Sequence, residues 1–183
     1  VHALELFGDK VRAKALAREH GVPLIAGSGG PVDEAQARAF LAALPAGAAM
    51  MIKAVGGGGG RGMRAVRTEA ELAEAYPRCR SEARAAFGLD EVYVERLIER
   101  ARHVEVQVIG DAAGAITHLW ERECTIQRRH QKLVEIAPSP SLADALRARI
   151  VDAALVLARA AGYDSLGTFE FLVDADADPD GPD

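Results

Sequence analysis

Four lysines and one run of glycines provide the first chemical signal in this sequence. The chain has 22 basic residues, of which 18 are arginine and only Lys10, Lys14, Lys53 and Lys132 are lysine. Lysine where arginine is the default favours a compact ammonium over a planar fork, which suits a phosphate oxygen. Lys14 has polar neighbours on a predicted helix and receives no role. The other three lysines each adjoin a motif.

The glycine-rich segment 56–62 lies between two apolar stretches, 51–55 and 63–66. Six of its seven residues are glycine, and such a segment forms neither a stable helix nor a packed strand, because glycine has the most entropy to lose and buries no side chain. β-Branched residues on both sides predict a hairpin whose tip can lie over a ligand. Main-chain amides without a Cβ, next to Lys53, therefore predict a phosphate-binding loop.

Better-known glycine motifs fit this segment less well. Residues 57–62 formally match G-x-G-x-x-G, but that dinucleotide pattern must open a helix, whereas an extended stretch follows here. No G-K-[ST] closes the loop, which excludes a Walker A site, and the sequence contains neither the H-R-D nor the D-F-G of a kinase. A disordered glycine linker is the plain alternative, and the flanking apolar stretches argue against it.

A second unusual stretch is the polar segment 121–132, which interrupts an otherwise apolar neighbourhood. Such a cluster is costly to hold together unless it faces water or a charged ligand. A solvated loop is the alternative that composition leaves open. Cys124 lies within this segment, but no third group that orients a base can be identified, so the thiol is expected to be a bystander.

Polar faces of two predicted strands complete the candidate residues. His103, Glu105 and Gln107 alternate with valines and share one strand face. These three side chains could be exposed to water or could line a cleft, and the sequence leaves both alternatives open. In the strand 167–173, aromatic residues face the core and Glu170 points the other way. A carboxylate there is either exposed or a ligand of Mg²⁺, which prefers carboxylate oxygens.

The overall composition excludes several classes of function. A chain of 183 residues with 49% apolar content can bury a core, as one domain or two small ones. The net charge of −5 provides no basic field for nucleic acid. An apolar run of about 18 residues and a signal-like start are both lacking, so a cytoplasmic location and no membrane are expected. Cys79 and Cys124 lack the spacing of a zinc site or a disulfide scaffold.

Hydrophobic periodicity and stop signals predict mixed helices and strands. Asp33 is expected to cap one helix. Thr68 begins a capping box that opens a second helix, which ends before Gly88, and Ser141 is expected to cap a third helix. The expected helices are about 3–20, 34–44, 69–87 and 142–161. The expected strands are about 22–26, 51–55, 63–66, 92–95, 103–108, 115–123, 133–136 and 167–173. This order predicts an α+β fold.

Taken in order, these motifs resemble the ATP-grasp region of a biotin carboxylase, as found in biotin-dependent acyl-CoA, pyruvate or urea carboxylases. The resemblance covers essentially the whole chain. Other ATP-grasp ligases share the glycine hairpin in weaker form, whereas Q-R-R-H-Q-K singles out the carboxylases. The matching segments are 8–10 (GDK), 52–63 (IKAVGGGGGRGM), 102–105 (RHVE), 127–132 (QRRHQK) and 167–171 (GTFEF).

The resemblance implies an ATP-grasp fold with two subdomains. Residues 1–24 would be a lead-in helix and linker, and 25–97 a small lid subdomain of antiparallel sheet plus helices that carries the glycine hairpin. Residues 98–183 would be part of the second, sheet-based subdomain, truncated at its C-terminus.

The resemblance also implies a role for each matching residue. Lys132 would lie near the γ-phosphate and bicarbonate as the catalytic residue, and Glu170 would be the first of two magnesium glutamates. The residues expected to bind the nucleotide are Lys10, Lys53, Gly58, Gly59, Gly60, Gly62, Met63, Glu95, Arg96, Leu97, His103, Gln127 and His130.

The implied reaction is the MgATP-dependent carboxylation of biotin by bicarbonate through carboxyphosphate. ATP and Mg²⁺ (or Mn²⁺) would be the cofactors, with biotin as the substrate on a separate carrier domain. The expected partners are ATP, bicarbonate and this biotinylated carrier domain, with no nucleic acid and no membrane, in an oligomeric parent protein. The final acceptor, an acyl-CoA, pyruvate or urea, is chosen by another domain.

Two alternatives stay open, a non-catalytic nucleotide-binding ATP-grasp module and a carbamoyl-phosphate-synthesising ATP-grasp half, which the segment 127–132 disfavours. The chain ends before the family's second magnesium glutamate and its bicarbonate base.

We therefore expect these 183 residues alone to have no carboxylase turnover and at most weak affinity for ATP. Bicarbonate-dependent ATP cleavage by the isolated chain would contradict this expectation.

Overall fold

The computed structural model describes residues 2–56, 61–129 and 131–176. The chain divides into two compact units. One consists of Phe7–Ala15 and Leu24–Leu97 and is called the hairpin unit here. The other contains Leu16–Pro23 and the described residues from Ile98 onward, and is called the α5 unit after its long helix. Within the described ranges, every helix is too short or too polar to cross a membrane.

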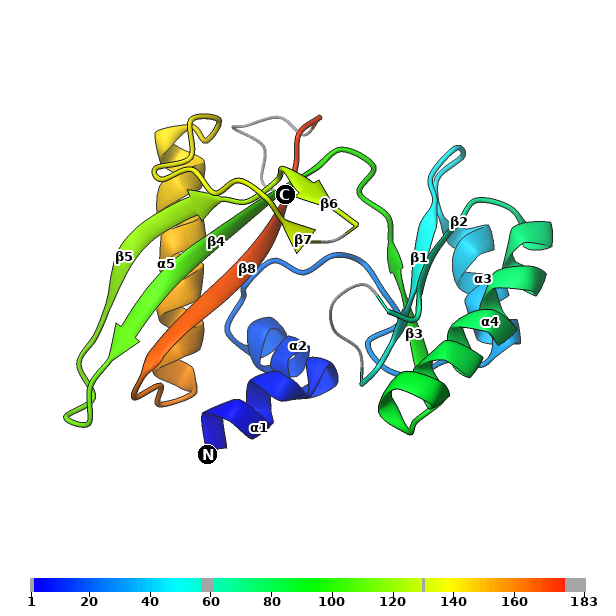
Figure 1. Ribbon diagram of the computed structural model, residues 1–183, viewed down its shortest axis with the longest axis horizontal. Helices are drawn as coiled ribbons and strands as arrows, with labels where there is room; N and C mark the ends of the chain where they lie inside the picture. Colours follow the sequence, from blue (N-terminus) through cyan, green and yellow to red (C-terminus); the bar gives the residue numbers. More distant parts are fainter. Residues whose placement is uncertain (1, 57–60, 130, 177–183) are drawn as a thin grey trace. The chain divides into compact units, whose positions relative to one another are not determined.

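The hairpin unit is built on a three-stranded antiparallel sheet in the order β2-β1-β3, with β1 at Met50–Ala54, β2 at Met63–Val66 and β3 at Val92–Arg96. Helices α3 (Glu34–Ala43) and α4 (Glu69–Phe87) lie on one side of it (Figure 1). Alternate strand residues point toward these helices, and the core that they form is fully buried. Its strand members are Met50, Ile52, Val66, Val92 and Val94.

The ends of these helices confirm the capping signals in the sequence. The Asp33 side chain accepts the N–H of Gln36, whose side chain in turn accepts the N–H of Asp33, so the capping box is complete. Thr68 accepts the N–H of Glu71, but the Glu71 side chain accepts the N–H of Arg67, so only half of the predicted capping box forms. Gly88 ends α4 in the left-handed conformation, with φ at 78°, which costs glycine little because it has no Cβ.

The predictions for the first 27 residues were wrong in two places. The expected helix 3–20 is two helices, α1 (His2–Gly8) and α2 (Lys10–Glu19). Asp9 separates them because its carboxylate accepts the N–H groups of Val11 and Arg12 and so starts a new helix. The expected strand 22–26 is not formed, and only Gly27 makes a bridge, to Glu95.

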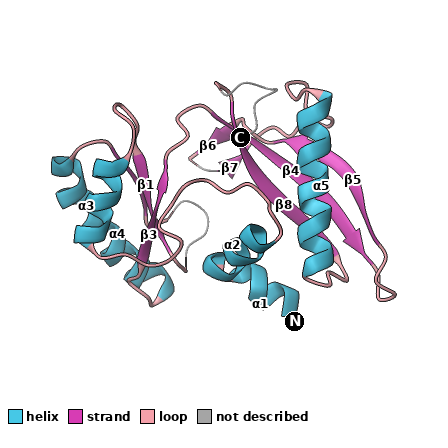
Figure 2. Cartoon of the chain, turned by 180° about the vertical axis from the view of Figure 1, so that it is seen from behind, coloured by secondary structure: helices cyan, strands magenta, loops and turns pink. Residues whose placement is uncertain are grey.

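The α5 unit contains a second three-stranded antiparallel sheet, in the order β5-β4-β8. Its strands are β4 (Ala101–Gly110), β5 (Ile116–Glu123) and β8 (Leu166–Asp174). Helix α5 (Asp144–Ala160) runs along one face (Figure 2). The valines of β4 are fully buried against this helix, and Phe169 and Phe171 of β8 pack on the same side, as predicted. Glu105 and Glu170 therefore belong to the opposite face.

A β-bulge changes which residues of β5 face the helix. Val106 pairs with Glu121 and Val108 pairs with His118, so Leu119 and Trp120 together oppose a single residue of β4. Trp120 has φ at 63°, the left-handed conformation found at such insertions. Because one extra residue reverses the alternation, His118 and Glu121 lie on the same face.

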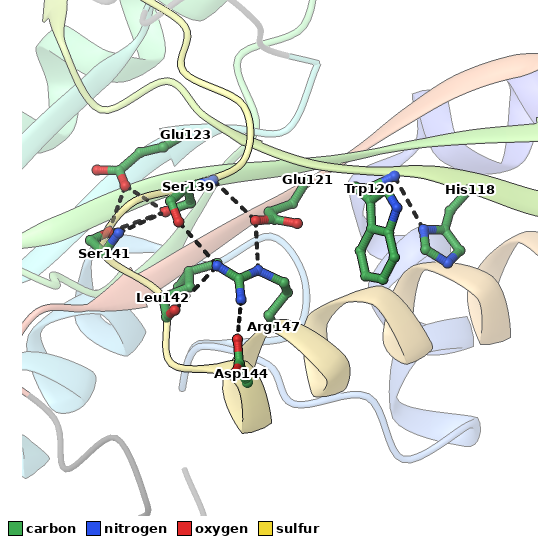
Figure 3. A network of polar contacts seen from close by, with 9 residues as sticks. All are labelled: His118, Trp120, Glu121, Glu123, Ser139, Ser141, Leu142, Asp144 and Arg147. Atoms are coloured by element: carbon green, nitrogen blue, oxygen red, sulfur yellow. Dashed lines mark hydrogen bonds and ion pairs between the residues drawn. The ribbon is translucent and has the colours of Figure 1, made fainter.

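The bulge brings Glu121 into a buried polar network (Figure 3). Its Oε1 accepts Nε–H of Arg147 on α5 at 2.9 Å and the N–H of Ser139 at 3.0 Å. The hydroxyls of Ser139 and Ser141 both donate to Oε2 of Glu123, at 2.7 and 2.5 Å. These hydrogen bonds hold the polypeptide segment between β5 and α5 against the sheet.

Two further predictions were wrong, and the network explains the first of them. Ser141 does not cap α5, because its hydroxyl donates to Glu123; the residue at the cap is Ala143, which makes no side-chain hydrogen bond. The segment 133–136 is not a strand either, and only Ile136 forms a bridge, to Glu123. In both places, contacts distant in sequence decide over the local signal.

Because of this network, the stability of the α5 unit is expected to depend on pH. Burial opposes the charge of Glu121, but hydrogen bonds from Arg147 and from Ser139 outweigh it, so the pKa of Glu121 lies below its ordinary value of 4.5. Stability due to ionised Glu121 is then complete above about pH 4.5 and is lost as the pH falls further.

We expect the free-energy difference between the parent and Glu121→Gln to shrink as the pH falls below about 4.5, in urea unfolding. Glu74→Gln, at an exposed site on α4, is the control without such a change. A constant difference across this range would contradict the prediction.

Candidate functional site

The predicted glycine hairpin is confirmed where the structure describes it. Strands β1 and β2 pair with Lys53 opposite Met63, and Ala54 N–H donates to the carbonyl of Gly62 at 3.0 Å. Gly62 is buried with φ at +64°, and a Cβ there would lie 3.0 Å from Cβ of Ala54. The position requires glycine. Met63 is half-buried. Gly58, Gly59 and Gly60 lie outside the described residues.

The second face of the hairpin-unit sheet carries charged residues. Lys53 and Tyr93 are cross-strand partners, and Glu95 follows two residues later on the same face. Glu95 is only 3% exposed, and its Oε2 pairs with Nζ of Lys53 at 2.5 Å. Its Oε1 pairs with Nζ of Lys14 on α2. A Cβ at Gly27 would come within 3.0 Å of Cγ of Glu95, so this turn also makes room for the carboxylate.

Lys10 and Lys53 both have lowered pKa values. Burial lowers the pKa of Lys10. Burial and the Lys10 ammonium together lower the pKa of Lys53 to about 8, in spite of the ion pair with Glu95. A buried ammonium group whose pKa is lowered by a positive neighbour is stabilised by a bound anion. This part of the site is suited to phosphate oxygens.

Arg96 is the last residue of β3, and Leu97 follows it directly. The N–H of Arg96 donates to Ala26 O and that of Leu97 to Ala49 O, both at 2.8 Å. The Arg96 side chain is exposed and that of Leu97 is half-buried. Their role in binding an adenine stays a prediction.

In the α5 unit, a row of charges crosses the open face of the sheet. Arg122 of β5, Glu105 of β4 and Glu170 of β8 are direct cross-strand partners. Glu105 is 1% exposed and pairs with Nε of Arg122 at 2.6 Å. Lys132 Nζ binds Glu105 and lies 2.6 Å from Oε1 of Glu170. The predicted residues Lys132 and Glu170 are thus brought together.

Lys132 is a permanent cation in this setting. Burial opposes its charge, but hydrogen bonds to Glu105 and Glu170 outweigh burial and raise its pKa. It is suited to hold an anion and unsuited to accept a proton at neutral pH. Cys124 is buried, and burial followed by the charge of Glu105 raises the pKa of its thiol, so it remains protonated, as expected for a bystander.

Gln127 and His103 each form a hydrogen bond with the backbone of Cys124. Strands β6 (Gln127–Arg128) and β7 (Gln131–Lys132) form a short antiparallel ribbon with Gln127 opposite Lys132. Gln127 Nε2 donates to the Cys124 carbonyl at 3.0 Å, and the N–H of Cys124 donates to His103 O at 2.8 Å. His130 lies outside the described residues.

The described residues contain no group of three or more His, Cys, Asp and Glu side chains that could hold a metal ion by themselves. The Glu170 side chain is 64% exposed, whereas Glu105 is occupied by two cations. Mg²⁺ is usually bound through one or two carboxylates plus substrate phosphates. Glu170 therefore fits as one ligand of a shared Mg²⁺.

Sequence reasoning missed Lys14 and Arg122 and left Glu105 undecided. Lys14 shares the carboxylate of Glu95 although 81 residues separate them. The strand pattern placed Glu105 on the face opposite the core, and this face is covered at that point by Arg122 and Lys132. The one usable signal was an acid in the middle of a valine-rich strand, since a buried acid needs a cation.

Solved structures similar to this chain include biotin carboxylases. A biotin carboxylase from Campylobacter jejuni, solved as a beta-gamma-ATP complex, is 45% identical with a TM-score of 0.88, over 97% of this chain and 40% of that one. The biotin carboxylase domain of the Hydrogenobacter thermophilus 2-oxoglutarate carboxylase, with MgADP, ADP and bicarbonate, is 41% identical with a TM-score of 0.89. That match covers 96% of this chain and 38% of the other.

Curated relatives extend the likeness to pyruvate carboxylases. The Bacillus subtilis enzyme is 54% identical over 93% of this chain, and the Staphylococcus aureus enzyme is 52% identical over 94%. The chain spans 15% of the length of each of these two relatives.

A family model agrees with both comparisons. Residues 9–179 match the model described as the carbamoyl-phosphate synthase L chain, ATP binding domain. The expected ATP-grasp fold and the resemblance to biotin carboxylase are confirmed. The chain belongs to the carbamoyl-phosphate synthase L chain ATP-binding domain family, in which its matching relatives are biotin carboxylases and pyruvate carboxylases.

Proposed function

We propose that this chain supplies ATP-grasp machinery for the MgATP-dependent carboxylation of biotin by bicarbonate through carboxyphosphate. The observation that carries the proposal is the pair formed by Lys53, which lies on β1 directly before the glycine hairpin and binds the buried Glu95, and Lys10, whose positive charge adds to burial in lowering the pKa of Lys53. Such a pair is stabilised by an anion with several negative oxygens, as on a triphosphate. The relatives solved with a beta-gamma-ATP ligand and with MgADP support this ligand class.

Lys53 and Lys10 are assigned to the nucleotide phosphates, where their charges offset those of the oxygens. Lys132 is assigned to the oxygens of bicarbonate and the γ-phosphate, because Glu105 and Glu170 hold it protonated and fixed in position. A fixed cation does not reorganise as negative charge develops, which lowers the barrier to phosphoryl transfer.

Glu170 is assigned as one ligand of Mg²⁺, which when bound offsets charge on the transferring phosphoryl group. The bicarbonate ligand of the Hydrogenobacter thermophilus relative supports the second substrate. We infer that the carboxyl acceptor is biotin on a carrier domain, since curated relatives are pyruvate carboxylases.

The first test is Lys53→Ala in the full product of the gene that contains this sequence. Affinity for MgATP is expected to fall about 10- to 100-fold, the size expected for losing one charged hydrogen bond, and bicarbonate-stimulated ATP hydrolysis is expected to be lost. Arg12→Ala, at an exposed position on α2, is the matched control and should bind normally. Calorimetric titration showing equal affinity for parent and Lys53→Ala would refute the proposal. Tight binding without any bicarbonate-stimulated hydrolysis in the parent would instead favour a non-catalytic nucleotide-binding module.

The second test concerns the metal. Glu170→Gln is expected to raise the Mg²⁺ concentration at half-maximal ATP hydrolysis about tenfold or more, because an amide is a weaker ligand than a carboxylate. Glu74→Gln, an exposed glutamate on α4, should leave the Mg²⁺ requirement unchanged. An unchanged requirement in Glu170→Gln would remove Glu170 from the metal site.

A further inference from the structure

The carboxylate of Glu95 is shared between two lysines that come from different elements. Its Oε2 binds Lys53 of β1 at 2.5 Å, and its Oε1 binds Lys14 of α2. Glu95 is 3% exposed, so its charge has almost no water to solvate it and must be compensated by these two ammonium groups. The orientation of one carboxylate therefore fixes the positions of both lysines.

Lys14 is held on a second side as well. Its Nζ lies 4.5 Å from the centroid of the Tyr93 ring, a cation–π contact. Tyr93 and Glu95 are two residues apart on the same face of β3, and Tyr93 is also the cross-strand partner of Lys53. Lys14 thus fits between an aromatic face and a carboxylate, and its side chain is 23% exposed.

Two ammonium groups share this carboxylate. Lys14 and Lys53 each bind one oxygen of Glu95, and the positive charge of Lys10 lowers the pKa of Lys53 after burial. Among the described residues, the titratable groups near Lys53 include Lys10 and Lys14 from α2 and Glu95 and Tyr93 from β3. Strand β2 opposes Lys53 with Met63, which carries no charge. Because Lys14 takes one oxygen of Glu95, the carboxylate does not fully neutralise Lys53.

We propose that Lys14 is a positioning residue for Lys53, acting through Glu95. It fixes the carboxylate against Lys53 and takes up part of its charge, so that Lys53 is held in place and still carries positive charge for a phosphate oxygen. The inference rests on the proposed function, in which that phosphate belongs to ATP. It adds a residue to which the sequence pattern gave no role.

Removing Lys14 has a specific electrostatic consequence. In Lys14→Met, Glu95 would have Lys53 as its remaining partner among these lysines, and Lys53 would lose a positive neighbour. Both changes favour protonated Lys53 and raise its pKa. They also strengthen the pair with Glu95, with which a phosphate group must then compete. Nucleotide affinity near neutral pH should fall although Lys53 is more fully charged.

The experiment measures Lys53 directly, in the nucleotide-free full product of the gene. The rate of acetylation of Lys53 by acetic anhydride, followed by mass spectrometry across pH, gives the pKa of its amine. The parent should titrate near pH 8. Lys14→Met and Lys14→Gln should titrate about one pH unit higher. Lys14→Arg should restore the parent value, and Arg12→Met, on the exposed side of the same helix, should leave it unchanged.

A second measurement gives the dissociation constant of MgATP near pH 7 for the same variants. Lys14→Met should bind about tenfold more weakly, as expected for disturbing one charged contact, and Lys14→Arg should recover most of the affinity. If Lys14→Met does not fold, Lys14→Gln carries the test, because it keeps a hydrogen-bond donor to Glu95 without the charge.

The possible failures are distinguishable. If Lys14→Met and Lys14→Gln keep the Lys53 titration and MgATP affinity of Arg12→Met while Lys53→Ala loses binding, Lys14 has no positioning role and the inference is overturned. If Lys53→Ala binds MgATP as the parent does, the proposed function itself fails. A shifted titration together with weaker MgATP binding, both reversed by Lys14→Arg, supports the inference, and a shifted titration with unchanged MgATP affinity overturns the positioning role.

Discussion

The cost of burying a carboxylate governs the polar architecture of this chain. Glu95, Glu105 and Glu121 are almost fully buried, and each is bound by at least one cationic side chain. An unpaired charge in such a position would be strongly destabilising, so the acid and its partner must be ordered together. In two of the three cases the partner is a lysine that the proposed reaction uses. The buried glutamates therefore hold these lysines in fixed positions.

Both units apply this arrangement to the same kind of scaffold. Each has a three-stranded antiparallel sheet with helices packed on an apolar face and charged residues on the other. Because side chains alternate along a strand, the core residues and the site residues are neighbours in sequence: Ile52 precedes Lys53, and Val104 precedes Glu105. The packing of one face thus fixes the geometry of the other, which places the lysines on rigid strands or against them.

The sequence predicted most helices and strands, because their signals are local. Asp33, Thr68 and Gly88 mark helix ends through hydrogen bonds and φ angles that involve only nearby residues. The prediction failed at Ser141 because a distant partner decides: its hydroxyl binds Glu123 of β5. The break between α1 and α2 was missed although the contacts of Asp9 that cause it are local. The site shows the same division. Lys53, Lys132 and Glu170 could be found from motifs. Lys14 could not, because its partner Glu95 is distant in sequence and no motif links the two residues.

The bulge at Leu119 and Trp120 has an evolutionary consequence. With one residue fewer at this point, the part of β5 before the bulge would shift its register by one residue. Ile116 and His118 would then point away from α5, and their sequence neighbours would point toward it. A lineage could not lose this residue by a single in-frame deletion without breaking either the packing under α5 or the anchoring of Glu121. Length at this strand is therefore expected to vary less than composition, even at so exposed a tryptophan.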